Sequence, residues 1–446
     1  MIDQALYRRQ FLQQTGATAL CGATLIGSSA GVTRAVAASC APAEDTPSMN
    51  RSPNESIVVG IMGLNGRGGA LADSFMAQPN VKIGGLCDVD QRVLARTASS
   101  VTNKQGTAPS TYTDVRKMLE DSAIDALVVA APNHWHAPAT ILGCQAGKHV
   151  YVEKPCSYTP REGELAVAAA RKHKRVVCMG NQRRSFASFI DAIDKLRQGV
   201  IGPIHYVRTW YNARRPSVGT GNVVAPPAEL NFELWQGPAP DRPYLDNLLH
   251  YNWHWYWHWG NGELGNNGIH SLDVARWALG LDYPRQVTAT GGRYGFRDDQ
   301  ETPDTMMVSY DFGSATITWE GLSCSAYGPG GSGYGLSFHG AEGTLVLQDS
   351  GYKILDGSNK EVATAAGSGG LGDHLANFLA CVRSGDRPNS DIEEAHKSTL
   401  LCHLGNIAYR LGRALKIDPR NGNIVGDEQA TGLWSREYRK GWEPTV

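Results

Sequence analysis

Charged residues are scarce in this chain, and neither sign is in excess. Asp, Glu, Lys and Arg make up 19% of the 446 residues, and the net charge is −1. The lack of a basic excess argues against a nucleic acid as a partner. Beyond residue 40, no apolar run reaches the roughly 20 residues of a membrane-spanning helix. None of the nine cysteines stands in a CxxC pair, which argues against a disulfide framework.

Uncharged polar and aromatic residues take the place of the missing charges. The chain has 51 glycines and 11 tryptophans, and 41% of its residues are hydrophobic, which is enough for folded cores. The length suggests two or three domains. This charge-poor, tryptophan-rich composition is a first indication of a neutral, hydroxyl-rich ligand such as a sugar or polyol.

The first 40 residues have the pattern of an export signal. Arg8-Arg9 is a twin-arginine pair, an apolar stretch follows, and Ala35–Ala37 offers a cleavage site. We therefore predict a twin-arginine signal peptide at residues 1–40, a linker at 41–55, and export to the periplasm or the cell exterior. A lipid anchor on Cys40 is the less favoured alternative.

The segment after the linker has the pattern of a dinucleotide-binding turn. An apolar strand over Ser56–Met62 leads into a glycine-rich turn, and a helix follows over Ala70–Met76. Gly63 permits the tight turn and Gly68 lets the helix pack close to the strand. The second position of the fingerprint is Asn65 rather than glycine, and Asn tolerates left-handed backbone better than most residues.

A carboxylate stands at the distance at which such a fold binds the ribose of the cofactor. The strand Val81–Cys87 ends at Asp88, which lies 20 residues beyond Gly68. A carboxylate at this position would repel a 2′-phosphate, so the sequence favours NAD over NADP.

Two further buried strands end in polar motifs. Ile124–Ala131 runs into Pro132-Asn133-His134-Trp135-His136, and His149–Val152 runs into Glu153-Lys154-Pro155. Ligands of doubly wound sheets bind beyond the carboxyl ends of the strands. We therefore expect both motifs to lie at the same ligand site.

Together these motifs resemble the Gfo/Idh/MocA family of sugar and inositol oxidoreductases. Glu153-Lys154-Pro155 is the most diagnostic, and Trp235-Gln236-Gly237-Pro238 resembles the exported, twin-arginine members. The similarity runs from about residue 56 to 415. It implies an α/β protein, with an N-terminal Rossmann domain at 56–176 and a C-terminal substrate-binding α/β domain at 177–446.

The expected second domain has an open, mostly antiparallel sheet and C-terminal helices. Leu371–Arg383 and Asp391–Leu415 are helical by their apolar period. Strands are expected at Ile204–Trp210, Gln286–Gly291, Met306–Phe312, Thr316–Gly321, Ser337–Gly340 and Thr344–Leu347.

The resemblance assigns Lys154 and His270 as catalytic residues. Where the family often has an aspartate, four residues before His270, this chain has Asn266, and we interpret Asp273 as a helix residue paired with Arg276. The expected substrate residues are His136, Asn181, Gln182, Trp257, Trp259, Asn266 and His270. The expected cofactor residues are Gly63, Asn65, Gly66, Arg67, Gly68, Asp88, Pro132, Asn133, His136, Glu153 and Lys154.

The segment Tyr251–Trp259 alternates aromatic residues and histidines. If it is extended, its four tryptophans share one face. Some of these rings would then stack on a sugar or close the cleft; a buried aromatic core or an oligomer contact is an equally good interpretation. A metal site of His250, His254 and His258 is disfavoured, because no HExxH pattern is present.

Three functions remain open on the sequence alone. The first is NAD-dependent oxidation of a sugar or polyol hydroxyl, with a tightly bound cofactor because free NAD is scarce outside the cytoplasm. The second is an NAD-dependent glycoside hydrolase that oxidises C3, eliminates, adds water and reduces again; the known α-N-acetylgalactosaminidase branch departs at Glu-Lys-Pro, whereas this chain keeps Lys154. The third is a sugar-binding or NAD-sensing protein without activity. Homodimer and homotetramer are both open, and no metal is expected.

Overall fold

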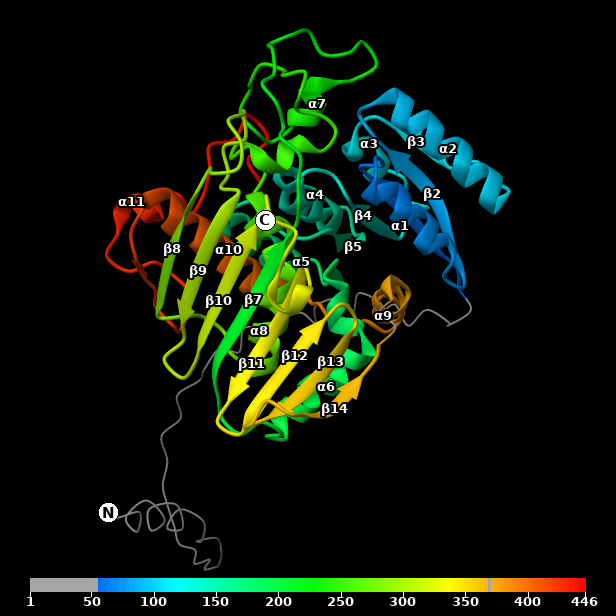
Figure 1. Cartoon of the computed structure of the whole chain (residues 1–446). Helices are drawn as coiled ribbons and strands as arrows, with labels where there is room; N and C mark the ends of the chain where they lie inside the picture. Colours follow the sequence, from blue (N-terminus) through cyan, green and yellow to red (C-terminus); the bar gives the residue numbers. More distant parts are fainter. Residues whose placement is uncertain (1–54, 368–369) are drawn as a thin grey trace, which may run out of the picture. The chain divides into compact units, whose positions relative to one another are not determined.

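The computed structural model describes residues 55–367 and 370–446 (Figure 1). The predicted signal peptide at 1–40, and the predicted linker except its last residue, lie outside the described residues. Two sheets carry the described part of the chain.

The first sheet is a Rossmann sheet, as predicted. Within the described residues it has six parallel strands in the order β3-β2-β1-β4-β5-β6, the order of dinucleotide-binding folds. The last strand, β6, extends the sheet past the expected domain boundary at residue 176. The strands are β1 (Ile57–Met62), β2 (Val81–Cys87), β3 (Ser110–Tyr112), β4 (Ala126–Val129), β5 (His149–Val152) and β6 (Val177–Met179).

Three helices of this half begin at side-chain caps. Asp90 caps α2, Asp114 caps α3 and Thr159 caps α5, each accepting a hydrogen bond from a backbone N–H of the first turn. The start of each of these helices is thereby fixed relative to the strand before it. The helices are α1 (Arg67–Met76), α2 (Gln91–Gln105), α3 (Val115–Leu119), α4 (Asn133–Gln145) and α5 (Pro160–Lys172).

The second sheet is mixed and mostly antiparallel, which confirms that prediction. In the described part of the chain its order is β14-β13-β12-β11-β7-β10-β9-β8-β15, and the pair β7–β10 is parallel. Buried and half-buried residues alternate along the strand β10, as expected when one face of a sheet is covered. The strands are β7 (Ile204–Asn212), β8 (Gln286–Gly292), β9 (Thr305–Asp311), β10 (Thr316–Leu322), β11 (Tyr334–Gly340), β12 (Gly343–Gln348), β13 (Gly351–Asp356), β14 (Glu361–Ala365) and β15 (Leu415–Lys416).

Three helices cover the buried face of this sheet. They are α6 (Ala187–Arg197), α8 (Ile269–Leu279) and α10 (Ile392–Leu411). The helix predicted at Asp391–Leu415 is shorter, because Gly412 adopts a left-handed conformation with φ +63° and ends α10. Leu415 instead lies in β15 and pairs with Val287 of β8.

One C-terminal helix belongs to the core of the nucleotide-binding half. The helix α9 (Leu371–Ser384) packs on α1, and Phe378 meets the edges of Phe75 and Tyr151. The helix α10 likewise packs on α5. The two halves therefore share cores instead of meeting only at a site.

The segment between β7 and α8 differs from the extended form considered for Tyr251–Trp259. Asn252–Trp255 forms a 3₁₀ turn and irregular backbone follows, so the tryptophans do not share a strand face. Trp253 and Trp259 are buried in an aromatic cluster with Trp235, which lies on the short helix α7 (Phe232–Gln236). The buried-core interpretation holds for these two rings.

Candidate functional site

A pocket of about 510 Å³ lies at the carboxyl ends of the Rossmann strands. The second half of the chain contributes its other wall, from β7, the segment after it, and the π-helical turn Leu264–Gly268. The pocket brings together many predicted residues from both halves. These are Gly63, Asn65, Gly66, Arg67, Asp88, Pro132, Asn133, His136, Glu153, Lys154 and Asn266.

The glycine-rich turn leaves no room for larger residues at two positions. Gly63 has φ +80°, and a Cβ there would lie 2.6 Å from the backbone nitrogen of Ala131. A Cβ on Gly68 would lie 1.7 Å from the carbonyl oxygen of Gly63. Gly66, with φ +62°, precedes the first turn of α1 and has open space beside it. A close backbone approach at a helix start is what a pyrophosphate requires, so the turn fits NAD.

Asn65 lies in this turn and contacts the next helix. Its Oδ1 accepts a hydrogen bond of 3.1 Å from Arg96 of α2. An asparagine at the second fingerprint position can therefore fix the turn to α2, which a glycine could not do.

Asp88 lies at the end of β2, where the sequence places the ribose carboxylate. Its Oδ2 accepts a hydrogen bond of 2.7 Å from the backbone N–H of Leu64, and its Oδ1 accepts one of 2.9 Å from that of Asp90. Burial raises the pKa of Asp88, and these N–H groups act in the opposite direction. The carboxylate is thus held in place facing the pocket, where it could bind the ribose hydroxyls of NAD.

An ion pair joins the glycine turn to the Glu-Lys-Pro motif. Arg67 Nε, at the start of α1, lies 2.6 Å from Glu153 Oε1, at the end of β5. This contact spans neighbouring edges of the pocket and neutralises the charge of Glu153, which precedes Lys154.

Lys154 is a half-buried cation whose hydrogen-bond partners are neutral. Its Nζ donates to the carbonyl oxygen and to the Oδ1 of Asn266, each at 2.8 Å. Among the described residues, no carboxylate lies within ion-pair distance of this ammonium group. Burial lowers the pKa of Lys154. An ammonium group has three N–H donors, so one remains for a ligand in the pocket.

His136 lines the pocket, yet both its ring nitrogens are taken. Nδ1 lies 2.6 Å from the carbonyl oxygen of Pro155, and Nε2 lies 2.7 Å from that of Ala131. The ring therefore braces the backbone on both sides of the site and has no free nitrogen for a sugar hydroxyl.

His270 lies at the start of α8 and is not among the residues that line this pocket. Its side chain is 8% exposed, and its Nδ1 has no hydrogen-bond partner among the described residues. Burial lowers the pKa of His270 well below 6.5, and the charges of Arg183 and Lys154 act in the same direction. The ring is therefore neutral.

Four other predicted substrate residues also lie outside the lining of the described pocket. Gln182 is half-buried beside Asn181 and Trp257 is half-buried in the aromatic segment, whereas Trp259 is buried in the aromatic cluster. Asn181 is fully buried and donates from Nδ2 to Asp273 Oδ2 at 2.5 Å.

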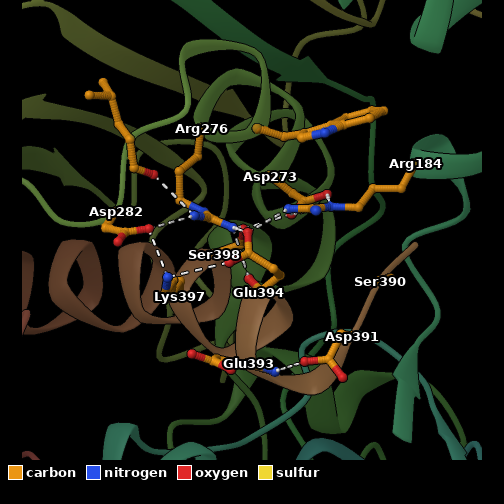
Figure 2. Close-up of polar contacts among 12 residues, drawn as sticks. Arg184, Asp273, Arg276, Asp282, Ser390, Asp391, Glu393, Glu394, Lys397 and Ser398 are labelled. Carbon is orange, nitrogen blue, oxygen red and sulfur yellow. Dashed lines mark hydrogen bonds and ion pairs between the residues drawn. The ribbon is translucent and has the colours of Figure 1, made fainter. Parts of the chain in front are cut away.

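From the sequence we expected Asp273 to pair with Arg276. In the structure, these two side chains do not pair. Asp273 lies 2.8 Å from Nη2 of Arg184, whereas Arg276 lies 2.5 Å from Glu394 of α10 (Figure 2). Both side chains leave α8 toward partners that are distant in sequence, so a helix-spacing argument could not find them.

The pocket contains two groups that motif reasoning missed. His254 donates from Nδ1 to the carbonyl oxygen of Tyr251 at 2.7 Å, which leaves Nε2 as an acceptor. Burial lowers the pKa of His254 to about 3, so the ring is neutral. Arg215 pairs with Glu263, at 2.5 Å and 3.1 Å, and lies over the ring of Trp255. The aromatic segment pointed to His254, but no motif marks Arg215.

The described residues contain neither a metal-ligand cluster nor a membrane-spanning helix. Across 55–367 and 370–446, no group of three or more His, Cys, Asp or Glu side chains is arranged to hold a metal ion. Within the same ranges, no helix combines the length and apolarity that crossing a bilayer requires.

Comparison with curated proteins and solved structures gives sugar-related relatives. The chain is 29% identical over 211 residues to "Glycosyl hydrolase family 109 protein 1" of Shewanella sp. (strain MR-4), which covers 45% of this chain and 44% of that protein. The match thus spans less than half of that relative. An aldose-aldose oxidoreductase from Caulobacter crescentus has the same fold, with TM-score 0.64 and 20% identity over 81% of this chain and 100% of the other. Levoglucosan dehydrogenase, solved with NADH and levoglucosan, gives TM-score 0.64 and 18% identity over 81% and 99%.

Family models match nearly all of the described chain. The oxidoreductase family model with the NAD-binding Rossmann fold matches residues 57–181. Two C-terminal models of the same family match residues 189–346 and 344–444. The protein therefore belongs to the Gfo/Idh/MocA family of NAD-binding oxidoreductases, as the motifs in its sequence predicted.

Proposed function

We propose that this protein uses NAD to oxidise a hydroxyl group of a sugar or polyol. The observation that carries the proposal is the Lys154 ammonium, which lines the dinucleotide pocket and donates hydrogen bonds to neutral oxygen atoms. A cation without a carboxylate partner favours negative charge on a ligand oxygen. The sugar-active relatives support the choice of substrate class.

The oxidation removes a hydride from carbon and a proton from oxygen. When bound, NAD would accept the hydride. The free N–H of Lys154 would hold the reacting oxygen and stabilise its negative charge. His254 Nε2, an acceptor in the same pocket, would accept a hydrogen bond from the reacting hydroxyl and pass its proton on to water, because a ring with a pKa of about 3 does not retain it. His270, predicted from the sequence as the base, remains a second candidate, although it is not among the residues that line the pocket.

The similarity to a protein named as a glycosyl hydrolase favours a second reaction. The relative named for glycosyl hydrolase family 109 is 29% identical to this chain over 211 residues. A glycoside hydrolase with NAD would oxidise the sugar at C3, release the aglycone, add water and reduce the sugar again. Such a cycle consumes no NAD, which suits the exported location that we propose from the twin-arginine pattern.

One assay separates the two reactions. The purified full-length protein, supplied with NAD, is offered sugars, polyols and chromogenic glycosides, and NADH absorbance and aglycone release are followed together. Net NADH from a sugar or polyol supports the proposed oxidation. Aglycone release without net NADH supports the second reaction. Sugar binding without either product would contradict both and leave a binding protein.

Replacement of Lys154 tests the chemistry directly. We expect Lys154→Ala to lower kcat by at least about 100-fold, because one electrostatic donor is lost from the reacting oxygen. Its affinity for NAD, measured by NADH fluorescence titration, should stay within a few-fold of wild type. The control is Lys172→Ala, an exposed lysine at the end of α5. A Lys154→Ala enzyme with wild-type turnover would refute the assignment.

A further inference from the structure

A segment of the second half pairs with the loop that follows β2. The backbone N–H of Gln91 donates to the carbonyl of Glu229 at 3.0 Å, and the N–H of Asn231 donates to that of Val89 at 2.9 Å. Asp90 and Leu230 face each other in this short antiparallel bridge. The loop is the one that carries Asp88, so the segment reaches the predicted ribose end of the pocket. In Figure 1 the segment leads into α7, and the loop leads into α2.

A side-chain contact closes the same edge a second time. His250 Nε2 lies 3.1 Å from Asp90 Oδ2. Asp90 is 1% exposed, caps α2, and donates its backbone N–H to Asp88. Movement of His250 is therefore linked through Asp90 to the carboxylate placed to bind ribose.

Apolar packing holds the segment against the loop. Leu230, Trp235 and Trp253 line the pocket and belong to one buried cluster, against which Val89 of the loop packs. These side chains would have to leave their buried positions if the segment swung away from the loop. Opening this edge therefore breaks hydrogen bonds and exposes apolar surface together.

We propose that residues 229–231 and His250 form a clasp over the bound dinucleotide, and that NAD leaves only when this clasp opens. The clasp contacts come from the second half of the chain, whereas the turn and Asp88 that fit the cofactor come from the first half. The cofactor then leaves more slowly than it would from the Rossmann turn alone. The proposal rests on NAD binding and is independent of the sugar substrate.

The test measures how fast NADH leaves the full-length protein. The protein is loaded with NADH and mixed with a large excess of NAD, and the decay of bound NADH fluorescence is followed. His250→Ala should release NADH about 2- to 10-fold faster than wild type, the change expected from one hydrogen bond. The matched control is His205→Ala, an exposed histidine on β7, which should release NADH at the wild-type rate.

A second pair of variants isolates the backbone bridge. Asn231 caps α7 through its side chain and donates its N–H to Val89. Asn231→Ala loses the cap alone, whereas Asn231→Pro loses the cap and the N–H. With φ −78°, position 231 accepts the proline ring. Asn231→Pro should therefore release NADH several-fold faster than Asn231→Ala.

The two pairs of variants can refute the proposed clasp without any measurement of catalysis. Circular dichroism and thermal melting first establish that each variant is folded. If folded His250→Ala retains the wild-type release rate and Asn231→Pro matches Asn231→Ala, the clasp does not control release. No sugar enters these measurements, so a wrong substrate class would leave their outcome unchanged.

Discussion

At the scale of single residues, burial sets the charge state of the groups that face the pocket. Burial lowers the pKa of Lys154 and lowers the pKa of His254 to about 3. Arg215 is half-buried, and Glu263 neutralises it. Among the described residues, the pocket therefore offers Lys154 as a cation without a carboxylate partner and His254 as a neutral imidazole with a free nitrogen, which suits a neutral hydroxyl better than an anionic ligand.

The low pKa of His254 predicts an unusual pH profile. The ring is neutral throughout pH 5 to 8. A free imidazole would give an acid-side loss of kcat/KM with a midpoint near pH 6.5, and we expect no such loss here. His254→Gln should lower kcat by about 100- to 10,000-fold if Nε2 takes the proton. The control is His258→Gln, which changes a histidine outside the pocket lining. Wild-type activity in His254→Gln would return the role of base to His270.

Motifs predicted the residues of this site whose partners are near in sequence. Gly63, Gly68 and Asp88 follow from spacing alone, because a tight turn and a ribose carboxylate occupy fixed places after the first strand. His254 and Arg215 could not be predicted in this way. Their places depend on how the long segment between β7 and α8 folds back over the sheet.

At the scale of the elements, a buried polar network fixes α8 against its neighbours (Figure 2). Asp273 of α8 is fully buried and accepts hydrogen bonds from Arg184, Asn181 and Ser398. These partners come from the segment after β6 and from α10. The network thus holds α8, whose first residues follow the Asn266 turn, in register with both halves of the chain.

Breaking this network should cost far more than breaking its exposed rim. Asp273→Ala leaves Arg184 buried with only the longer ion pair to Glu394, at 3.7 Å, so we expect a loss of about 3–5 kcal/mol in the free energy of unfolding. Asp282→Ala removes a half-exposed carboxylate at the edge of the network and should cost about 0–1 kcal/mol. Urea unfolding measures both. Equal losses for the two variants would show that the buried Asp273–Arg184 pair does not dominate the contribution of this network to stability.

At the scale of the whole molecule, the described residues share cores and a pocket. The helix α9 packs on the Rossmann half, and the pocket takes walls from both halves. A ligand in the pocket should therefore stabilise both halves together, and we expect one cooperative unfolding transition in place of two.

The shift in Tm on cofactor binding measures this shared stabilisation. NADH at about 100 times its Kd should stabilise the protein by about 2.7 kcal/mol, which raises Tm by about 3 °C for a chain of this size. Differential scanning calorimetry should show a single shifted transition. NADPH at the same concentration is the control, because Asp88 would repel its 2′-phosphate and give a smaller shift. An equal shift with NADPH would contradict the preference for NAD.

The sequence by itself determined the Rossmann fold, through strand periods and a turn whose geometry is set by a few neighbouring residues. Its motifs determined the family, and the resemblance to that family implied the mostly antiparallel second sheet and the place of Lys154. Tertiary structure alone decided that Asn266, 112 residues away, holds Lys154, that His254 lies in the pocket, and that His270 is not among the lining residues. Such contacts depend on packing between distant segments, and no local period or spacing encodes which distant side chains will meet.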